Sequence, residues 1–145
     1  MDINKILTLA NEALKSAQVT LIQQHVFMPV IIFLNDENKL DWISFNPQEE
    51  NFDDKLKNFL ENKSKTSEFL IQIIDSYYKE SSLNTISDSL FENPDADSAL
   101  AAFVYTKKYT YLKILSYLLN NDKYTFMEND WEDITNTRGI FKNPY

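Results

Sequence analysis

The sequence predicts one α+β domain, in which a mainly antiparallel sheet of about six strands packs against two helices on one of its faces. Two observations lead to this prediction. Apolar residues recur at three- and four-residue spacing in two segments, and short segments rich in Val, Ile, Phe and Tyr alternate with polar turns. A composition that is 43% hydrophobic over 145 residues is typical of a single folded domain spanning 1–145.

The amino-terminal part is expected to form a helix followed by a β-hairpin. Residues 2–24 carry an apolar stripe with helical periodicity, and Asp2 is the expected N-cap. Residues 26–35 and 39–45 predict two strands joined by a turn that contains no glycine. Pro29 lies within the first of them, which favours an edge position or a bulge there.

A second helix and a central strand are expected next. Asn46 is the predicted N-cap, Pro47 suits the first helical position, and the helix should stop near residues 61–63. Residues 68–78 are apolar on both faces, which indicates a strand in the middle of the sheet. Residues 80–98, dominated by Ser, Asn and Asp, are expected to be an irregular connection.

The carboxyl-terminal part predicts a three-stranded meander and a tail. The strands are expected at residues 99–106, 110–118 and 124–127, with Lys and Asn-rich turns between them. Residues 128–145 are polar and are interpreted as a loop or an extended carboxyl-terminal tail.

Several kinds of chemistry are disfavoured by what the sequence lacks. Gly139 is its single glycine, whereas phosphate-binding loops need glycine for close backbone approach to the ligand. The absence of cysteine excludes thiolate nucleophiles and Cys-based zinc sites, and one histidine cannot form a multi-His metal centre. We therefore predict neither a cofactor nor a metal, and we favour a protein without enzymatic activity.

The charge of the chain limits its expected partners. The net charge is −8, and Arg138 is the one arginine, so duplex nucleic acid is not an expected partner. The longest apolar run has nine residues, too few for a membrane-spanning helix, and the amino terminus does not resemble a signal peptide. We expect a cytoplasmic protein without a membrane partner. Abundant asparagine and an excess of lysine over arginine favour a bacterial or phage origin.

A row of tyrosines is the first candidate binding surface. Tyr109, Tyr111 and Tyr117 share one face of the strand predicted at 110–118. They would form either a solvent-facing row that binds a peptide or ligand, or cross-strand aromatic pairs on the outer face of the sheet.

The second candidate surface is the acidic segment that follows the meander. Glu128 and Asp130 precede Trp131, which would act as an aromatic anchor in an acidic docking face. The alternative is a solvated terminal segment whose tryptophan packs back onto the sheet.

His25 and an Asp-rich segment are weaker candidates. His25 is best explained as a residue at a helix end, where its imidazole bonds terminal carbonyl groups, rather than as a general base. Asp88, Asp95 and Asp97 offer carboxylates for a weak magnesium or calcium site, although turn formation explains them better.

These observations predict a non-enzymatic interaction or binding module. Its partner would be another protein or a second copy of the chain, bound through the tyrosine face, an exposed sheet edge or the acidic segment around Trp131. Two alternatives stay open. One is a metal-dependent hydrolase that uses the acidic residues of 88–97, and the other is a sensor domain that binds a small apolar ligand between sheet and helices.

Overall fold

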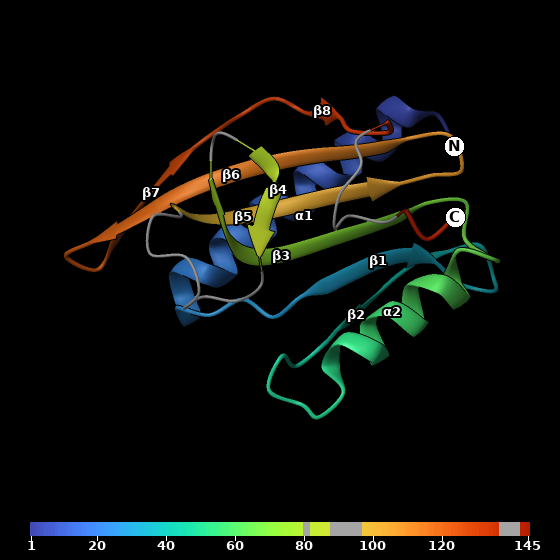
Figure 1. Ribbon diagram of the computed structural model, residues 1–145, viewed down its shortest axis with the longest axis horizontal. Coiled ribbons are helices and arrows are strands. Elements are labelled where there is room, and N and C mark those ends of the chain that lie inside the picture. The colour runs from blue at the N-terminus through green and yellow to red at the C-terminus, as the bar shows by residue number, and fades with distance from the viewer. Residues whose placement is uncertain (80–81, 88–96, 137–142) are drawn as a thin grey trace.

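The computed structural model describes residues 1–79, 82–87, 97–136 and 143–145 and shows two helices with an antiparallel sheet (Figure 1). The predicted α+β class is confirmed. The helices are α1 (Ile3–Gln24) and α2 (Phe52–Lys63). The strands are β1 (Val30–Leu34), β2 (Leu40–Ser44), β3 (Leu70–Lys79), β4 (Ser82–Ser87), β5 (Asp97–Tyr105), β6 (Thr110–Asn120), β7 (Lys123–Met127) and β8 (Glu132–Asp133). Within these described residues no helix is long and apolar enough to cross a lipid bilayer.

The sheet runs in the order β2-β1-β3-β5-β6-β7, and each neighbouring pair is antiparallel. One edge of β3 pairs with β1 near the start of the strand and with β4 near its end. In the same way, one edge of β6 pairs with β8 near its start and with β7 near its end. β2 therefore borders one side of the sheet, and β7 with β8 borders the other. The central position predicted for the strand at 68–78 is confirmed by β3.

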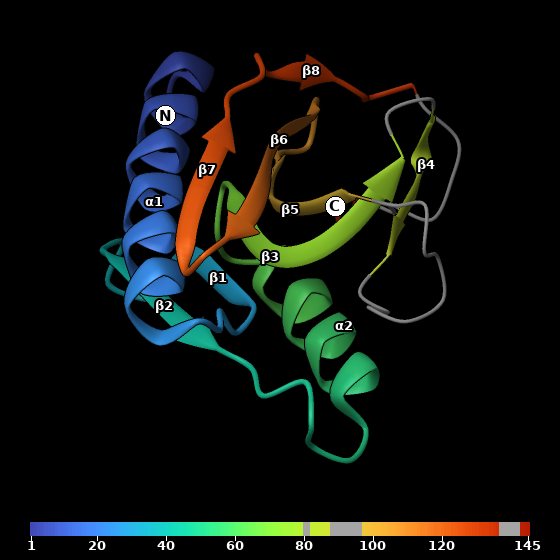
Figure 2. The same cartoon turned by 90° about the vertical axis from the view of Figure 1, so that its left-hand side faces the viewer.

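The two helices lie on opposite faces of the sheet, which corrects the prediction that they share one (Figure 2). Side chains alternate across β3, so that Ile71 and Ile73 pack in a cluster with α1. Leu70 and Ile74 pack in a second cluster with Leu56 of α2. Because both faces of β3 are apolar, one helical layer would leave one face in water, and the fold uses one helix for each face.

α1 forms where the periodicity predicted it. Asp2 adopts an extended conformation, and its side chain accepts a hydrogen bond from the backbone N–H of Asn4 at 3.1 Å. The helix ends at His25, which has the left-handed φ of 58° that glycine often provides. The buried stripe of α1 consists of Ile6, Ala10, Leu14, Ala17 and Leu21.

Two elements begin later than predicted. β1 starts at Val30, because Pro29 precedes the strand and contributes only its carbonyl, which accepts a hydrogen bond from Phe45. β1 also lies between β2 and β3, not at an edge. α2 starts at Phe52, because Asn46 instead closes a turn in which its side chain accepts the N–H of Gln48.

The segments predicted to be irregular contain ordered structure. β4 interrupts the connection expected at 80–98. The segment 128–145 is not a free tail: β8 pairs with β6, and Ile134 is 4% exposed within the cluster on the α2 face. Tyr145 packs against the same cluster, and its hydroxyl donates to the carbonyl of Ser67 at 2.6 Å. Burial of Ile134 and Tyr145 gives this polar segment enough apolar contact to hold it on the sheet.

Candidate functional site

The predicted tyrosine row lies on the α1 face and is not an open surface. Tyr111 and Tyr117 are partly buried in the cluster that α1 covers. Tyr117 contacts Tyr124 and Phe126 of β7, with ring centroids 5.7 Å apart in each pair. These contacts agree with cross-strand aromatic packing rather than with a solvent-facing row.

A half-buried carboxyl lies next to this row. Asp75 of β3 accepts a hydrogen bond from the hydroxyl of Tyr117 at 2.6 Å. Burial raises the pKa of Asp75 above its usual 3.8, and the bond from Tyr117 opposes that rise. Sequence reasoning missed Asp75, although an acidic residue directly after the mostly apolar segment 69–74 is a visible signal.

Replacing Asp75 with asparagine is expected to change the pH dependence of stability. A carboxyl with a raised folded-state pKa stabilises the fold when protonated, and this contribution is lost as the pH rises from 3.8 through the folded-state pKa. The amide of Asp75→Asn accepts the Tyr117 hydroxyl at every pH. Unfolding in urea should therefore show wild type losing stability relative to the variant as the pH rises. A relative gain by wild type would contradict the assignment.

Trp131 links the carboxyl-terminal segment to α1 through a hydrogen bond and packing. Its indole N–H donates to the side-chain oxygen of Asn11 at 3.1 Å, and the ammonium group of Lys113 donates to the same oxygen at 3.1 Å. The Lys113 ammonium also lies 5.9 Å from the centre of the Trp131 ring. The ring is partly buried in the α1-face cluster. This placement agrees with the alternative in which Trp131 packs back onto the sheet.

Glu128 and Asp130 remain exposed in the link between β7 and β8. Between them, the side-chain amide of Asn129 donates to the carbonyl of Ile114 at 3.1 Å. Ile114 lies in the part of β6 between the residues that pair with β8 and those that pair with β7. The link is thus fixed at its centre. As contact residues for a partner, Glu128 and Asp130 stay predictions.

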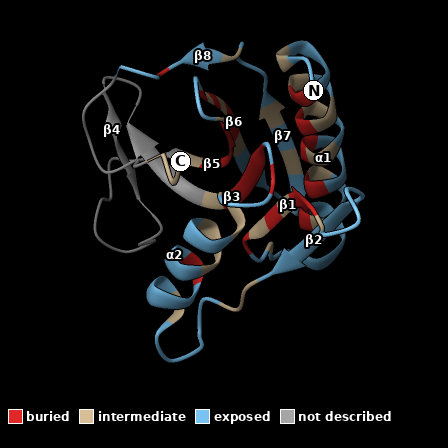
Figure 3. Ribbon diagram, turned by 90° about the vertical axis from the view of Figure 1, so that its right-hand side faces the viewer, coloured by how far each residue is buried: buried red, intermediate tan, exposed pale blue. Residues whose placement is uncertain are grey.

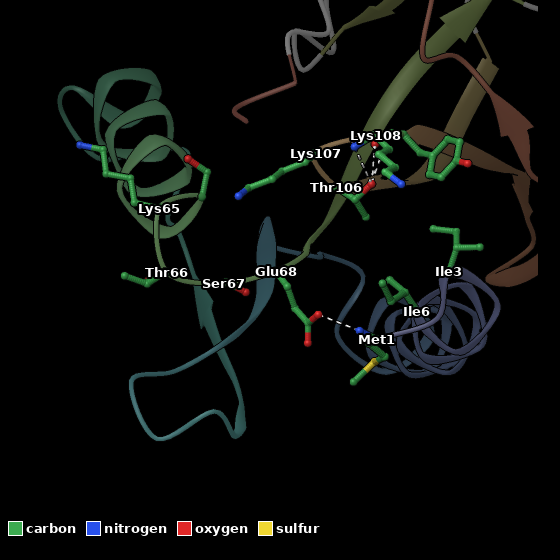
Figure 4. A pocket seen from close by; sticks show the side chains of 12 residues that line it. Met1, Ile3, Ile6, Lys65, Thr66, Ser67, Glu68, Thr106, Lys107 and Lys108 are labelled. Atoms are coloured by element: carbon green, nitrogen blue, oxygen red, sulfur yellow. Dashed lines mark hydrogen bonds and ion pairs between the residues drawn. The ribbon is translucent and has the colours of Figure 1, made fainter.

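Tyr109 borders a cleft as well as contacting the tyrosine row. Figure 4 shows this cleft. The cleft has a volume of about 490 Å³. Its walls are the start of α1, the α2–β3 connection at 64–68 and the β5–β6 turn at 106–109. Tyr109 is 39% exposed and contacts Tyr111, with ring centroids 5.8 Å apart.

His25 has the helix-end position predicted for it. Its backbone N–H donates to the carbonyl of Leu21 at 2.8 Å. The imidazole does not bond a helix carbonyl as expected, because its Nδ1 lies 3.1 Å from the hydroxyl of Tyr124. That contact joins the end of α1 to β7 and leaves His25 a structural role.

The metal alternative falls mostly outside the described residues, which include neither Asp88 nor Asp95. Asp97 is the first residue of β5. Across the ranges that the structure describes, no group of three His, Cys, Asp or Glu side chains is placed to hold a metal ion.

An exposed sheet edge was expected as a binding surface, but the sequence did not indicate which residues form it. In the structure, β2 lies at such an edge. All five of its residues are exposed, as the pale blue colour of β2 shows (Figure 3). Trp42, in the middle of the strand, is 65% exposed. Leu40 is 51% exposed, and Ile43 is 36% exposed. Alternation of apolar residues would place half of such a strand in the core, so the sequence alone concealed this exposure.

The exposed apolar side chains of β2 lie next to apolar side chains of β1. Trp42 pairs with Ile32 of β1, and Leu40 pairs with Leu34. In an antiparallel sheet, directly paired residues project to the same side, and Ile32 and Leu34 belong to the α1-face cluster. Ile43 pairs with Ile31 and therefore projects to the opposite face, which α2 covers. We call the exposed residues Leu40 and Trp42 the β2 surface.

Comparison of the chain with protein-family models, with curated proteins and with solved structures found no match.

Proposed function

We propose that this chain is a non-enzymatic protein-binding domain whose β2 surface contacts the partner. The observation that supports the proposal is Trp42, a large aromatic side chain that is 65% exposed on an ordered edge strand. Tryptophan is enriched among the residues that contribute most to binding energy at protein interfaces. An exposed apolar group beside a partly covered sheet face is typical of interaction sites.

The hydrogen bonds of β2 favour contact through side chains rather than through an added strand. The N–H of Phe45 donates to the carbonyl of Pro29, and the carbonyl of Lys39 accepts the N–H of Asn35. Because backbone groups alternate along an antiparallel strand, the odd-numbered residues of this segment direct their N–H and carbonyl groups toward β1. The N–H of Trp42 therefore points away from the sheet, where the carboxylate of Asp41 accepts it at 2.8 Å. An incoming strand would first have to displace this bond, which is one way in which proteins protect sheet edges.

The charge around the β2 surface favours a basic partner. Asp36 and Glu37 lie in the β1–β2 turn, Asp41 lies in β2, and all three are exposed. Lys39 is paired with Glu37 at 3.4 Å, which leaves a net negative charge on the hairpin. A partner that offers an apolar pocket bordered by lysine or arginine would complement this surface and the overall charge of −8.

The proposal includes the cytoplasmic location and the bacterial or phage origin, which are supported by composition alone. The metal-dependent hydrolase stays a prediction, because Asp88 and Asp95 are outside the described residues.

Partner capture with matched variants tests the proposal. The immobilised full chain, Trp42→Ala and Leu119→Ala are each exposed to lysate of the source organism, and retained proteins are quantified by mass spectrometry. Leu119 is 51% exposed on β6, which three strands separate from β2 in the sheet, so it is the control for loss of an exposed apolar side chain. Trp42→Ala should retain at least about tenfold less of a specific partner than wild type or Leu119→Ala.

Equal retention by Trp42→Ala and wild type would contradict the proposed surface. Retention of the chain itself as the main captured protein, confirmed by light scattering, would instead identify a second copy as the partner.

A further inference from the structure

We infer that the cleft beside Tyr109 is a binding site for a small organic anion, best matched by a phosphate group on an apolar body. This site is separate from the β2 surface and goes beyond protein binding. We name it the lysine cleft after Lys65, Lys107 and Lys108, which border it. A cavity of about 490 Å³ is in the size range of small-molecule sites.

The residues that border the lysine cleft carry a net positive charge, whereas the whole chain carries a net negative one. Three lysines border it, whereas Glu68 is its one acidic residue. Glu68 is paired with the ammonium group of Met1 at 2.7 Å. Among the described residues, no carboxylate lies within ion-pair distance of Lys65, Lys107 or Lys108. A local excess of positive charge in a chain of charge −8 provides the electrostatic basis for anion binding.

The apolar part of the cleft, which we call its floor, is limited to the side chains at the start of α1 and the ring of Tyr109. Ile6 is buried, Ile3 is partly buried, and the exposed ring of Tyr109 borders the same space. Figure 4 shows Ile3 and Ile6 on one side of the Met1–Glu68 pair and Lys107 extending across toward the α2–β3 connection. The ammonium group of Lys65 is directed away from the cleft in this view. Its long stem allows it to turn toward a bound anion.

The backbone that carries these groups is fixed by hydrogen bonds. The hydroxyl of Thr106 accepts the N–H groups of Lys108 at 3.3 Å and Tyr109 at 3.0 Å. Asn143 donates to the carbonyl of Thr106 at 2.9 Å. Across the cleft, the hydroxyl of Ser67 accepts the N–H of Leu34 and donates to the carbonyl of Phe69. Walls held in this way lose little conformational entropy when a ligand binds.

The residue types indicate the ligand class. Lysine is a point charge and cannot form the bidentate contact that arginine makes with a carboxylate, so recognition here depends on the amount of charge. The hydroxyls of Thr106, Ser64 and Ser67 already bond the protein, so they offer little directional recognition. A phosphate carries more negative charge than a carboxylate, and the apolar floor favours a hydrophobic body attached to it.

The test uses 1-naphthyl phosphate as probe and the amide chemical shifts of the ¹⁵N-labelled full chain as readout. The probe should shift the amides of 64–68 and 106–109 saturably. Inorganic phosphate and neutral 1-naphthol should each bind at least about fivefold more weakly, because each lacks one of the two contributions. Equal binding by naphthol would overturn the role of charge, and equal binding by inorganic phosphate would overturn the role of the apolar floor.

Charge variants separate the lysine cleft from general attraction. Lys107→Gln with Lys108→Gln should weaken the probe at least about fivefold, and Glu68→Gln should strengthen it. The exposed pair Lys39→Gln with Lys123→Gln removes the same charge elsewhere and should leave binding nearly unchanged. Loss of affinity equal in both double variants, or no saturable shift at the cleft, would overturn the inference. Trp42→Ala should bind the probe as wild type does, so failure here is distinguishable from failure of the protein-binding proposal.

Discussion

Replacing Phe69 with alanine is expected to lower the free energy of unfolding by about 3–5 kcal/mol. Phe69 is 0% exposed and precedes β3 in the cluster between α1 and the sheet. Removing its ring leaves a cavity that the surrounding helix and strands can only partly fill. Urea or guanidinium unfolding followed by circular dichroism measures the change.

The matched control for this prediction is the exposed tryptophan. Trp42→Ala removes a larger side chain, but one that is 65% exposed, and it should change stability by no more than about 0.5 kcal/mol. A loss below about 1 kcal/mol for Phe69→Ala would show that α1 is not closely packed on this face. A large loss for Trp42→Ala would show that the β2 surface is buried in solution.

Replacing Trp131 with alanine is expected to cost about 2–3 kcal/mol of stability. The indole is partly buried against α1 and loses its hydrogen bond to Asn11. The expected loss is below that for a fully buried aromatic ring because part of the side chain already contacts water. Equilibrium unfolding compared with Asn11→Ala measures it, and the smaller substitution should cost about 1 kcal/mol.

This prediction distinguishes the two roles considered for Trp131. A structural anchor loses stability when truncated, whereas a contact residue for a partner loses affinity. If Trp131→Ala left stability unchanged and abolished partner capture, the acidic segment with Glu128 and Asp130 would be the binding surface in place of β2.

The elements with strong local signals could be predicted from the sequence. α1 combines an apolar stripe with an Asp2 cap, and the meander β5–β6–β7 combines three apolar runs with polar turns. In each case the same residues determine local conformation and burial, so sequence and structure agree.

The arrangement of the helices depends on a pattern that sequence reasoning noticed but did not use. Residues 68–78 are apolar on both faces, and such a strand requires cover on both. The start of α2 was wrong for a different reason: Asn46 and Pro47 are suited both to a helix start and to a turn, and only the tertiary structure decides between them.

The candidate binding surfaces were least predictable because exposure depends on what covers a residue. Tyr111, Tyr117 and Trp131 look like contact residues in sequence, but α1 packs against them. Trp42 lies in the strand expected at residues 39–45, where no local signal marks it as exposed, but β2 forms the border of the sheet and remains exposed. Neither α1 placement nor strand order can be read from local spacing.

The affinity of the captured partner for wild type and for Trp42→Ala is the most direct measurement of the proposed function. Titration calorimetry with the purified partner should show a dissociation constant at least about tenfold larger for Trp42→Ala, with Leu119→Ala unchanged and all three chains equally stable. An unchanged dissociation constant for Trp42→Ala would show that the partner binds elsewhere and would contradict the assignment of the β2 surface.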